Sequence, residues 1–311
     1  MDCLTLGEPL ICFDSDDLPL DAAATVRTYA VGAESNVAIG LARLGWRVGY
    51  VGRVGGDSAG RIITRTLRGE GVDVRALRAV DDRVTGLLLK EGDGPGRVAV
   101  TYHRSGSAGS TLAPSDLPGD LTGLRRLHVT GITLVLGDDA RAAVLEAMRR
   151  ARAAGARVSL DANFRRKLAG DGELVAAFDA AAPLADEVFL GRGEAALCAG
   201  SDDDDEIESY ARALPASTVV LKKARGGATA FVDGARHDLD AHPVAVVDPV
   251  GSGDAFVVGF LHERLAGGGI DAALATGARV AARVIGRRGD YQGLPYRDDL
   301  VVADGRGAVS R

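Results

Sequence analysis

Short runs of β-branched and other apolar residues alternate along this chain with alanine-rich amphipathic stretches, and this alternation constrains the fold more than any other feature. Runs that predict buried strands lie at residues 4–6, 47–51, 126–130, 157–160, 187–190 and 218–221. Stretches that predict helices lie at residues 34–44, 58–69, 138–154, 203–213 and 253–265. Strands that alternate with helices build βα units around a parallel sheet. We therefore expect an α/β fold with a mostly parallel sheet flanked by helices.

Two regions interrupt this alternation, at residues 10–31 and at about 72–104. Each of them reads as short strands joined by turns, without a helix between the strands. Such strands have no helices to cover them, so we expect a small β-sheet that stands apart from the main sheet and acts as a lid. The chain of 311 residues contains no long linker, and we expect a single domain over residues 1–311.

The composition excludes several classes of protein. The formal net charge is −6 and there is no basic run, so we expect no nucleic-acid partner, because nucleic-acid surfaces need clustered positive charge. The first residues lack the pattern of a signal peptide, and no apolar stretch is long enough to cross a bilayer. Three scattered cysteines without metal-ligand spacing are typical of reduced thiols. We expect a cytoplasmic protein without a membrane partner.

The most informative segment is residues 246–256, with the sequence VVDPVGSGDAF. It predicts an apolar strand that leads into two glycines, followed by a helix that begins at about Asp254. Glycines permit a tight turn with exposed amides, and a helix N-terminus directs amides at an anion. Asp254 could be no more than a capping or first-turn residue. Beside an amide turn, however, its carboxylate could also accept a proton from a hydroxyl that attacks a phosphoryl group.

The sequence from Gly251 to Asp254 resembles the C-terminal signature of the ribokinase (PfkB) family, D-[TP]-x-G-A-G-D. The resemblance extends over essentially the whole chain and implies a ribokinase-like, doubly wound α/β fold with a β lid. It also implies an ATP-dependent sugar kinase that uses Mg²⁺, with Asp254 as the catalytic base and Gly251, Ser252 and Gly253 as an anion hole. Serine replaces the usual alanine at 252 but keeps the backbone amide.

Two turns in the N-terminal half also match the family. Residues 32–38 (GAESNVA) open one predicted helix and residues 52–60 (GRVGGDSAG) open another. Each could be an ordinary βα turn with its cap, but their order and spacing resemble the family's first signature. The resemblance implies that Gly32 and Asn36 face the sugar.

A nucleotide and metal site is implied by further matches. The chain has only four lysines among its 37 basic residues, and two of them are adjacent in residues 219–228 (VVLKKARGGA), where the family wraps the nucleotide. The resemblance assigns Glu194 to magnesium, through water. The residues that it assigns to the nucleotide are Asn163, Gly191, Lys222, Ala224, Arg225, Gly227 and Ala278. Glycine stands at 191 where the family often has asparagine, and core packing would explain Ala278 equally well.

Within the family, several stretches resemble the 2-keto-3-deoxygluconate kinases. The substrate residues that this implies are Tyr102, Arg104, Ile132, Arg165 and Asp290. Two arginines suit an acidic sugar, because a guanidinium can hold a carboxylate through two hydrogen bonds. Pairing with nearby acids is the alternative for each of them. Leu88 departs from these relatives, which tend to have a tyrosine that reaches the sugar.

Other functions remain as alternatives or are excluded. The chain has no G-x-x-x-x-G-K-[ST] loop and no G-x-G-x-x-G after its first strand, which argues against a P-loop enzyme and against a dinucleotide-dependent dehydrogenase. The alternatives are a fructokinase, a ribokinase, a kinase for a related keto acid, and a sugar or nucleotide sensor without turnover. We also expect a homo-oligomer that forms through the lid.

Overall fold

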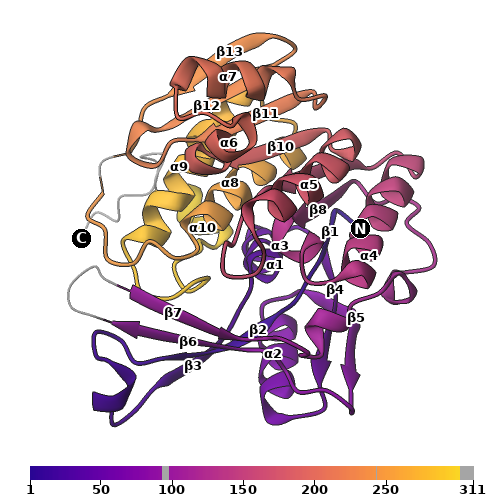
Figure 1. Ribbon diagram of the computed structural model, residues 1–311, viewed down its shortest axis with the longest axis vertical. Helices are drawn as coiled ribbons and strands as arrows, with labels where there is room; N and C mark the ends of the chain where they lie inside the picture. Colours follow the sequence, from indigo (N-terminus) through magenta and orange to yellow (C-terminus); the bar gives the residue numbers. More distant parts are fainter. Residues whose placement is uncertain (93–97, 243, 302–311) are drawn as a thin grey trace.

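The computed structural model describes residues 1–92, 98–242 and 244–301. Within these ranges nine strands form the main sheet, in the order β13-β12-β11-β10-β9-β8-β1-β4-β5 (Figure 1). Their bounds along the chain are β1 Cys3–Leu6, β4 Val48–Gly55, β5 Asp73–Val80, β8 Arg126–Thr130, β9 Arg157–Asp161, β10 Glu187–Gly191, β11 Thr218–Lys222, β12 Ala228–Val232 and β13 Ala235–Leu239.

The main sheet is parallel from β5 to β11, and β12 and β13 continue it as an antiparallel edge. Cys3 of β1 lies opposite both Val48 of β4 and Arg126 of β8. From β1 the chain builds outward to β4 and β5 on one side and to β8, β9, β10 and β11 on the other. In such a sheet the crevice for a ligand lies at the carboxyl ends of the strands, near the point where the order reverses.

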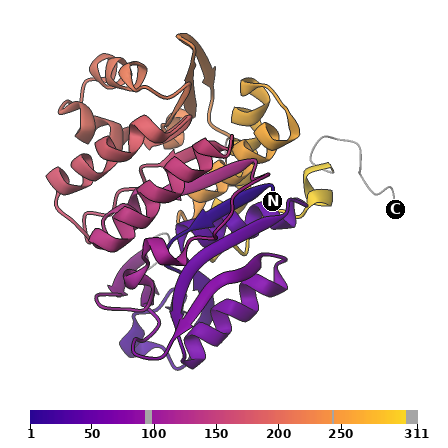
Figure 2. The ribbon, with the colours of Figure 1, turned by 90° about the vertical axis from the view of Figure 1, so that its right-hand side faces the viewer.

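Helices cover both faces of the sheet, and each face has its own hydrophobic core (Figures 1 and 2). One face carries α3 to α7 and the other carries α1, α2, α8 and α9. The bounds are α1 Ala33–Arg43, α2 Ser58–Gly69, α3 Gly131–Leu134, α4 Asp138–Ala153, α5 Asp171–Ala181, α6 Arg192–Ala199, α7 Asp204–Ala213, α8 Ser252–Ala266, α9 Ile270–Ile285 and α10 Arg297–Val301. None of these described helices is long and apolar enough to cross a membrane.

A second sheet of four strands, in the order β3-β2-β6-β7, projects from the main body at the lower left of Figure 1. Its strands are β2 Leu10–Asp14, β3 Arg27–Val31, β6 Leu87–Gly92 and β7 Val98–His103. Strand β2 is antiparallel to β3 and parallel to β6. A small apolar cluster that includes Leu10, Tyr29 and Leu88 holds these strands together. We call this sheet the lid.

The expected α/β architecture is confirmed, and each of the six predicted strands overlaps an observed one. Two interpretations were wrong. Residues 73–80 do not belong to the lid, because β5 pairs in parallel with β4 after the crossover helix α2. No residue of this edge strand is fully buried, and its sequence, DVRALRAV, lacks the apolar run of the inner strands. Residues 93–97 of the predicted lid segment lie outside the described residues.

The second error concerns the strand predicted just before Asp248. Val246 and Val247 are about two-fifths exposed, at 43% and 41%, and belong to no sheet. The amides of Val247 and Asp248 instead donate to the carbonyl of Ile285, at the end of α9. Apolar side chains alone suggested a buried strand here. The helix that follows begins at Ser252, one residue before the predicted range 253–265 and two before Asp254.

Candidate active site

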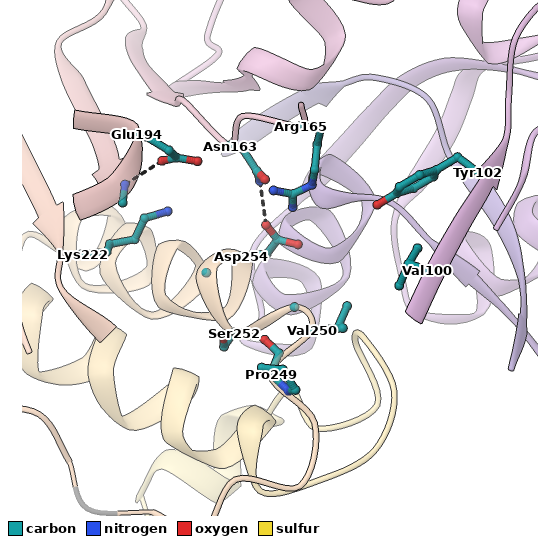
Figure 3. A pocket seen from close by; sticks show the side chains of 13 residues that line it. Val100, Tyr102, Asn163, Arg165, Glu194, Lys222, Pro249, Val250, Ser252 and Asp254 are labelled. Carbon is teal, nitrogen blue, oxygen red and sulfur yellow. Dashed lines mark hydrogen bonds between the residues drawn. The ribbon is translucent and has the colours of Figure 1, made fainter. Parts of the chain in front are cut away.

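A cavity of about 390 Å³ lies between the lid and the carboxyl edge of the main sheet (Figure 3). Strands β9, β10 and β11 end at this edge, and α8 begins there. The volume falls within the range of small-molecule sites. The lining residues are Val100, Tyr102, Asn163, Arg165, Gly191, Glu194, Lys222, Pro249, Val250, Gly251, Ser252, Gly253 and Asp254.

The turn of residues 249–253 gives the cavity its backbone donors. Gly251 has a φ of +76°, and a Cβ atom added there would lie 2.7 Å from the carbonyl oxygen of Asp290, so only glycine fits. The hydroxyl of Ser252 donates to the carbonyl of Pro249 at 2.8 Å, and its amide approaches the same oxygen at 3.4 Å. The amides of Gly253 and Asp254 fall in the first turn of α8, where a helix has no carbonyl partner for them. They are therefore the donors that the turn offers to an anion.

Asp254 is buried, at 8% exposure, and its carboxylate is held by two side-chain amides. Asn36 of α1 donates to Oδ2 at 2.9 Å and Asn163 donates to Oδ1 at 3.1 Å. Gly251 occupies the N-cap position, so the carboxylate does not cap the helix. Each carboxylate oxygen keeps a further lone pair. Asp254 can thus accept a proton from a hydroxyl placed in the cavity. It does not cap α8, but it does lie in the first turn of that helix, as one half of the alternative interpretation had it.

Lys222 brings a positive charge to the same turn. Its Nζ donates to both oxygens of Asp161, at 2.8 and 2.7 Å, and lies 3.6 Å from where a Cβ on Gly253 would be. Burial lowers the pKa of Lys222, but Asp161, Glu194 and other acids more than offset this and raise it overall. Burial raises the pKa of Asp161 to about 6, against the lowering effect of Lys222. Both groups are charged at neutral pH, which places an ammonium beside the amide donors.

Glu194 lines the cavity, but its carboxylate already accepts hydrogen bonds from two backbone amides. Its two oxygens accept from the amides of Phe164 at 2.8 Å and Gly191 at 2.6 Å. Among the described residues, no three potential ligands gather closely enough to enclose a metal ion. Mg²⁺ keeps several waters and needs only one or two carboxylates when phosphates supply the other ligands. Glu194 fits this mode of binding, through water, and does not fit a direct protein cage. Asp161 does not line the cavity, and both of its oxygens accept from Lys222.

Arg165 reaches into the cavity from the loop after β9, close to Asp254 (Figure 3). It is half-buried, and within the described ranges its guanidinium donates only to the carbonyl of Phe164, at 3.2 Å. None of the carboxylates that the structure describes forms an ion pair with it. The adjacent Arg166 instead pairs with Asp171 at the surface. Tyr102 of β7 points toward Arg165 from the lid side of the cavity.

The other predicted substrate residues do not line the cavity. Arg104 does not line it, and its guanidinium donates to the buried carboxylate of Glu8. Ile132 is buried in α3. Gly32 is the N-cap of α1 with a φ of +143°. Asp290 is buried behind Gly251, and burial raises its pKa to about 6, against the effect of Lys90. Only Arg165 and Tyr102 of the predicted sugar contacts line the cavity.

The predicted nucleotide residues divide into two groups. Asn163, Gly191 and Lys222 line the cavity. Residues 224–226 form a single 3₁₀ turn between β11 and β12, with Ala224 at a φ of +50° and Arg225 within the turn, and Gly227 follows. Ala278 packs partly buried on α9 against the core, as its alternative interpretation had it. Ala224, Arg225, Gly227 and Ala278 form the second group, which does not line the cavity.

Sequence reasoning missed a charged cluster between the lid and the turn. Lys90 of β6 forms ion pairs with Asp248 at 2.5 Å and with Asp290 at 3.8 Å, and all three side chains are buried. One signal was available, because Lys90 is among the four lysines of an arginine-rich chain. Its position on a strand without a helical neighbour gave no indication of its partner.

Comparisons with known proteins agree with this geometry. The 2-dehydro-3-deoxygluconokinase of Bacillus subtilis is 37% identical over 311 residues, covering 96% of this chain and 94% of that protein. A fructokinase of Klebsiella pneumoniae is 36% identical over 293 residues, covering 91% and 94%. Both relatives match nearly the full length of this chain.

Solved structures share the fold. The PfkB protein from Polaromonas sp. JS666 superposes with a TM-score of 0.87 at 33% identity, covering 97% of this chain and 99% of that one. The aminoimidazole riboside kinase from Salmonella enterica, in complex with aminoimidazole riboside and an ATP analog, gives 0.86 at 26% identity, with the same coverage. The fold is therefore that of a ribokinase-like carbohydrate kinase. The chain belongs to the pfkB family of carbohydrate kinases, whose model matches residues 4–297.

Proposed function

We propose that this carbohydrate kinase transfers the γ-phosphoryl group of ATP to a primary hydroxyl of a keto-sugar acid. The acid is 2-keto-3-deoxygluconate, also called 2-dehydro-3-deoxygluconate, and the product is its 6-phosphate. One observation carries the proposal: the guanidinium of Arg165 enters the cavity beside Asp254 without a carboxylate partner among the described residues. A half-buried guanidinium of this kind fits a ligand that brings its own carboxylate.

The reaction needs a base, donors for the phosphoryl oxygens and a place for the sugar. Asp254 accepts the proton as the hydroxyl attacks, while the amides of Gly253 and Asp254 stabilise the charge on the transferring group. Lys222 adds positive charge on the side of the nucleotide, which extends past Gly191 toward residues 224–227. Glu194 would hold Mg²⁺ through water, and the ion would neutralise charge on the phosphates. Tyr102 contacts the sugar, and Asn36 holds the carboxylate of Asp254 in place.

Two kinds of support favour the acid over a neutral sugar. The kinase of 2-dehydro-3-deoxygluconate from B. subtilis is similar along nearly the whole chain. The second is electrostatic, because a charge in a site that closes must be paired, and Arg165 offers the pair. Arg104 contributes less than its sequence position suggested, since Glu8 already neutralises it.

A neutral ketose is the second candidate. It is supported by the fructokinase of K. pneumoniae at nearly the same identity. Leu88, the position at which the family resemblance implied a tyrosine, packs in the apolar cluster of the lid and does not line the cavity. A sensor without turnover is less well supported, because binding alone does not require a carboxylate beside open amides.

A coupled assay that measures ADP release tests the proposal. Turnover of 2-keto-3-deoxygluconate should exceed that of fructose and ribose at equal concentration with MgATP. A preference for fructose or ribose would refute the acid assignment and leave the carbohydrate kinase. Absence of turnover with all sugars and sugar acids would favour the sensor.

Two expectations from the sequence stay predictions. One is that the protein acts in the cytoplasm. The other is that two copies pair through the lid, whose edges are β3 and β7, because an exposed strand edge can pair with that of a second copy. Size-exclusion chromatography with light scattering would measure the oligomeric state.

A further inference from the structure

Lys90 connects the lid to the turn that begins α8. Its side chain is almost fully buried, with the residue at 3% exposure, although lysine is among the residues least often buried. From strand β6 of the lid it reaches the main body, where Nζ lies 2.5 Å from Oδ2 of Asp248 and 3.8 Å from Oδ1 of Asp290. A third carboxylate, Asp14 of β2, lies near enough to act on it.

Asp248 connects Lys90 to the turn through hydrogen bonds to the backbone. Its Oδ1 accepts from the amide of Val250 at 3.1 Å, and its Oδ2 accepts from the amide of Gly289 at 3.2 Å. The carbonyl of the next residue, Asp290, sits directly behind Gly251. Asp248 thus fixes both the front of the turn and the loop on which the turn rests. Its charge is balanced by Lys90, which comes from a different sheet.

We propose that Lys90 is a positioning residue for phosphoryl transfer: from the lid, its ammonium holds Asp248 and so seats the turn that presents the amides of Gly253 and Asp254. The turn is then fully set only when the lid lies against the main body. This inference rests on the proposed role of the turn as the anion site. It assigns to the lid a part in assembling the site, beyond that of a cover that excludes water.

Other contacts between the lid region and the main body do not share this property. Lys167 donates to the carbonyl of Val100 on β7 at 2.6 Å. Arg288 pairs with Asp16 and Asp17, in the segment that follows β2. These contacts are exposed, and none of them includes a residue of the turn 249–253. Burial lowers the pKa of Lys90, but Asp290 and Asp248 raise it overall, so the residue stays charged in its buried position.

The test is Lys90→Met, which keeps the apolar stem and removes the charge, with Lys167→Met as the matched control. Removing one donor of an anion site lowers kcat about 100- to 1000-fold. A displaced turn still keeps its donors, so the effect of Lys90→Met should be smaller. We expect kcat of Lys90→Met to fall about 10- to 100-fold. KM for ATP should change less than about threefold, because the effect falls on the transition state. Lys167→Met should keep kcat within about threefold, since it removes one exposed contact of the lid and leaves the pairing of Lys90 with Asp248 intact.

A double-mutant cycle identifies the route. Asp248→Asn alone should lower kcat, and the double variant should be no slower than Asp248→Asn, because Lys90 acts through that carboxylate. If Lys90→Met does not fold, Lys90→Arg keeps the charge and should lose less than about fivefold, while Asp248→Asn still reports on the turn.

Three results would overturn the inference: a folded Lys90→Met with near-normal kcat, an equal loss in Lys167→Met, or losses that add in the double variant. Each of these leaves the proposed function standing so long as Asp254→Asn is inactive. Near-normal turnover in Asp254→Asn would instead remove the proposed function, and this inference with it.

Discussion

The side-chain amide of Asn163 donates a hydrogen bond of 3.1 Å to Oδ1 of Asp254, although 91 positions separate the two residues. Asn163 follows β9 at the carboxyl edge of the sheet and has a φ of +42°, a left-handed conformation that asparagine adopts more readily than most residues. Asn36 holds the other oxygen from α1. The carboxylate is therefore fixed from two sides, none of the cations that the structure describes is paired to it, and it remains available as a base.

Replacement of Asp254 by asparagine should leave a folded protein that turns over at least about 100-fold more slowly, the range expected when a general base is removed. ATP binding should persist, because the amides of the turn are unchanged. Steady-state rates, calorimetric titration with ATP and thermal melting measure the three properties. Asp271→Asn is the matched control, since Asp271 is an exposed first-turn carboxylate of the next helix. A folded Asp254→Asn with near-normal turnover would refute the assignment.

The sequence allowed the sheet and the turn to be predicted because both depend on local signals. Periodicity identified β8 and α2 with correct bounds, and glycine spacing identified the turn before α8. The partners of charged residues depend on tertiary packing and could not be inferred. Arg104 suggested a substrate contact until the structure placed Glu8 against it. The partner of Lys90 could not be inferred, because Asp248 lies 158 positions away in the sequence.

The lid should become more protected when both ligands bind. We expect amide hydrogen exchange in β2, β3, β6 and β7 to slow in the presence of 2-keto-3-deoxygluconate and a non-hydrolysable ATP analogue, because closure buries the face that carries Tyr102. Helix α4, on the far side of the main sheet from α8, serves as the internal reference and should not change. Mass spectrometry measures both. Unchanged exchange in the lid at saturating ligand would argue against closure.

Truncation of Arg165 should discriminate between acidic and neutral substrates. Arg165→Ala should lower kcat/KM for 2-keto-3-deoxygluconate about 30- to 1000-fold, or about 2–4 kcal/mol, the cost of removing one partner of a desolvated charge pair. Any activity on fructose should fall much less, since fructose carries no charge. Arg165→Lys should recover only part of the loss, because an ammonium lacks the planar fork.

The control for this prediction is the neighbouring Arg166→Ala, because Arg166 pairs with Asp171 at the surface and does not line the cavity. It should leave both activities within about twofold, as expected for an exposed pair. Equal losses on the acid and on fructose in Arg165→Ala would show that Arg165 supports the site without recognising a carboxylate.

The ion pair between Lys222 and Asp161 predicts a loss of stability whose size depends on pH. Lys222→Met leaves the buried carboxylate of Asp161 without its cation, which should cost about 3 kcal/mol in the free energy of unfolding at pH 8. Burial already raises the pKa of Asp161 to about 6, and without the lowering effect of Lys222 the pKa rises further. The carboxyl is then neutral at pH 5, where burying it costs little.

The direction of this pH dependence follows from the linkage between proton binding and folding. A carboxyl whose pKa is higher in the folded state binds its proton more tightly there, so it stabilises the fold at low pH and loses that contribution as the pH rises through the folded pKa. The deficit of Lys222→Met should therefore be less than about half as large at pH 5 as at pH 8. Urea unfolding at the two pH values measures it, with Lys223→Met as the control. Lys223 pairs with Glu208 near the surface, so its loss should stay below about 1 kcal/mol at both pH values. Equal deficits for Lys222→Met at pH 5 and pH 8 would mean that Asp161 does not depend on Lys222 for its charge.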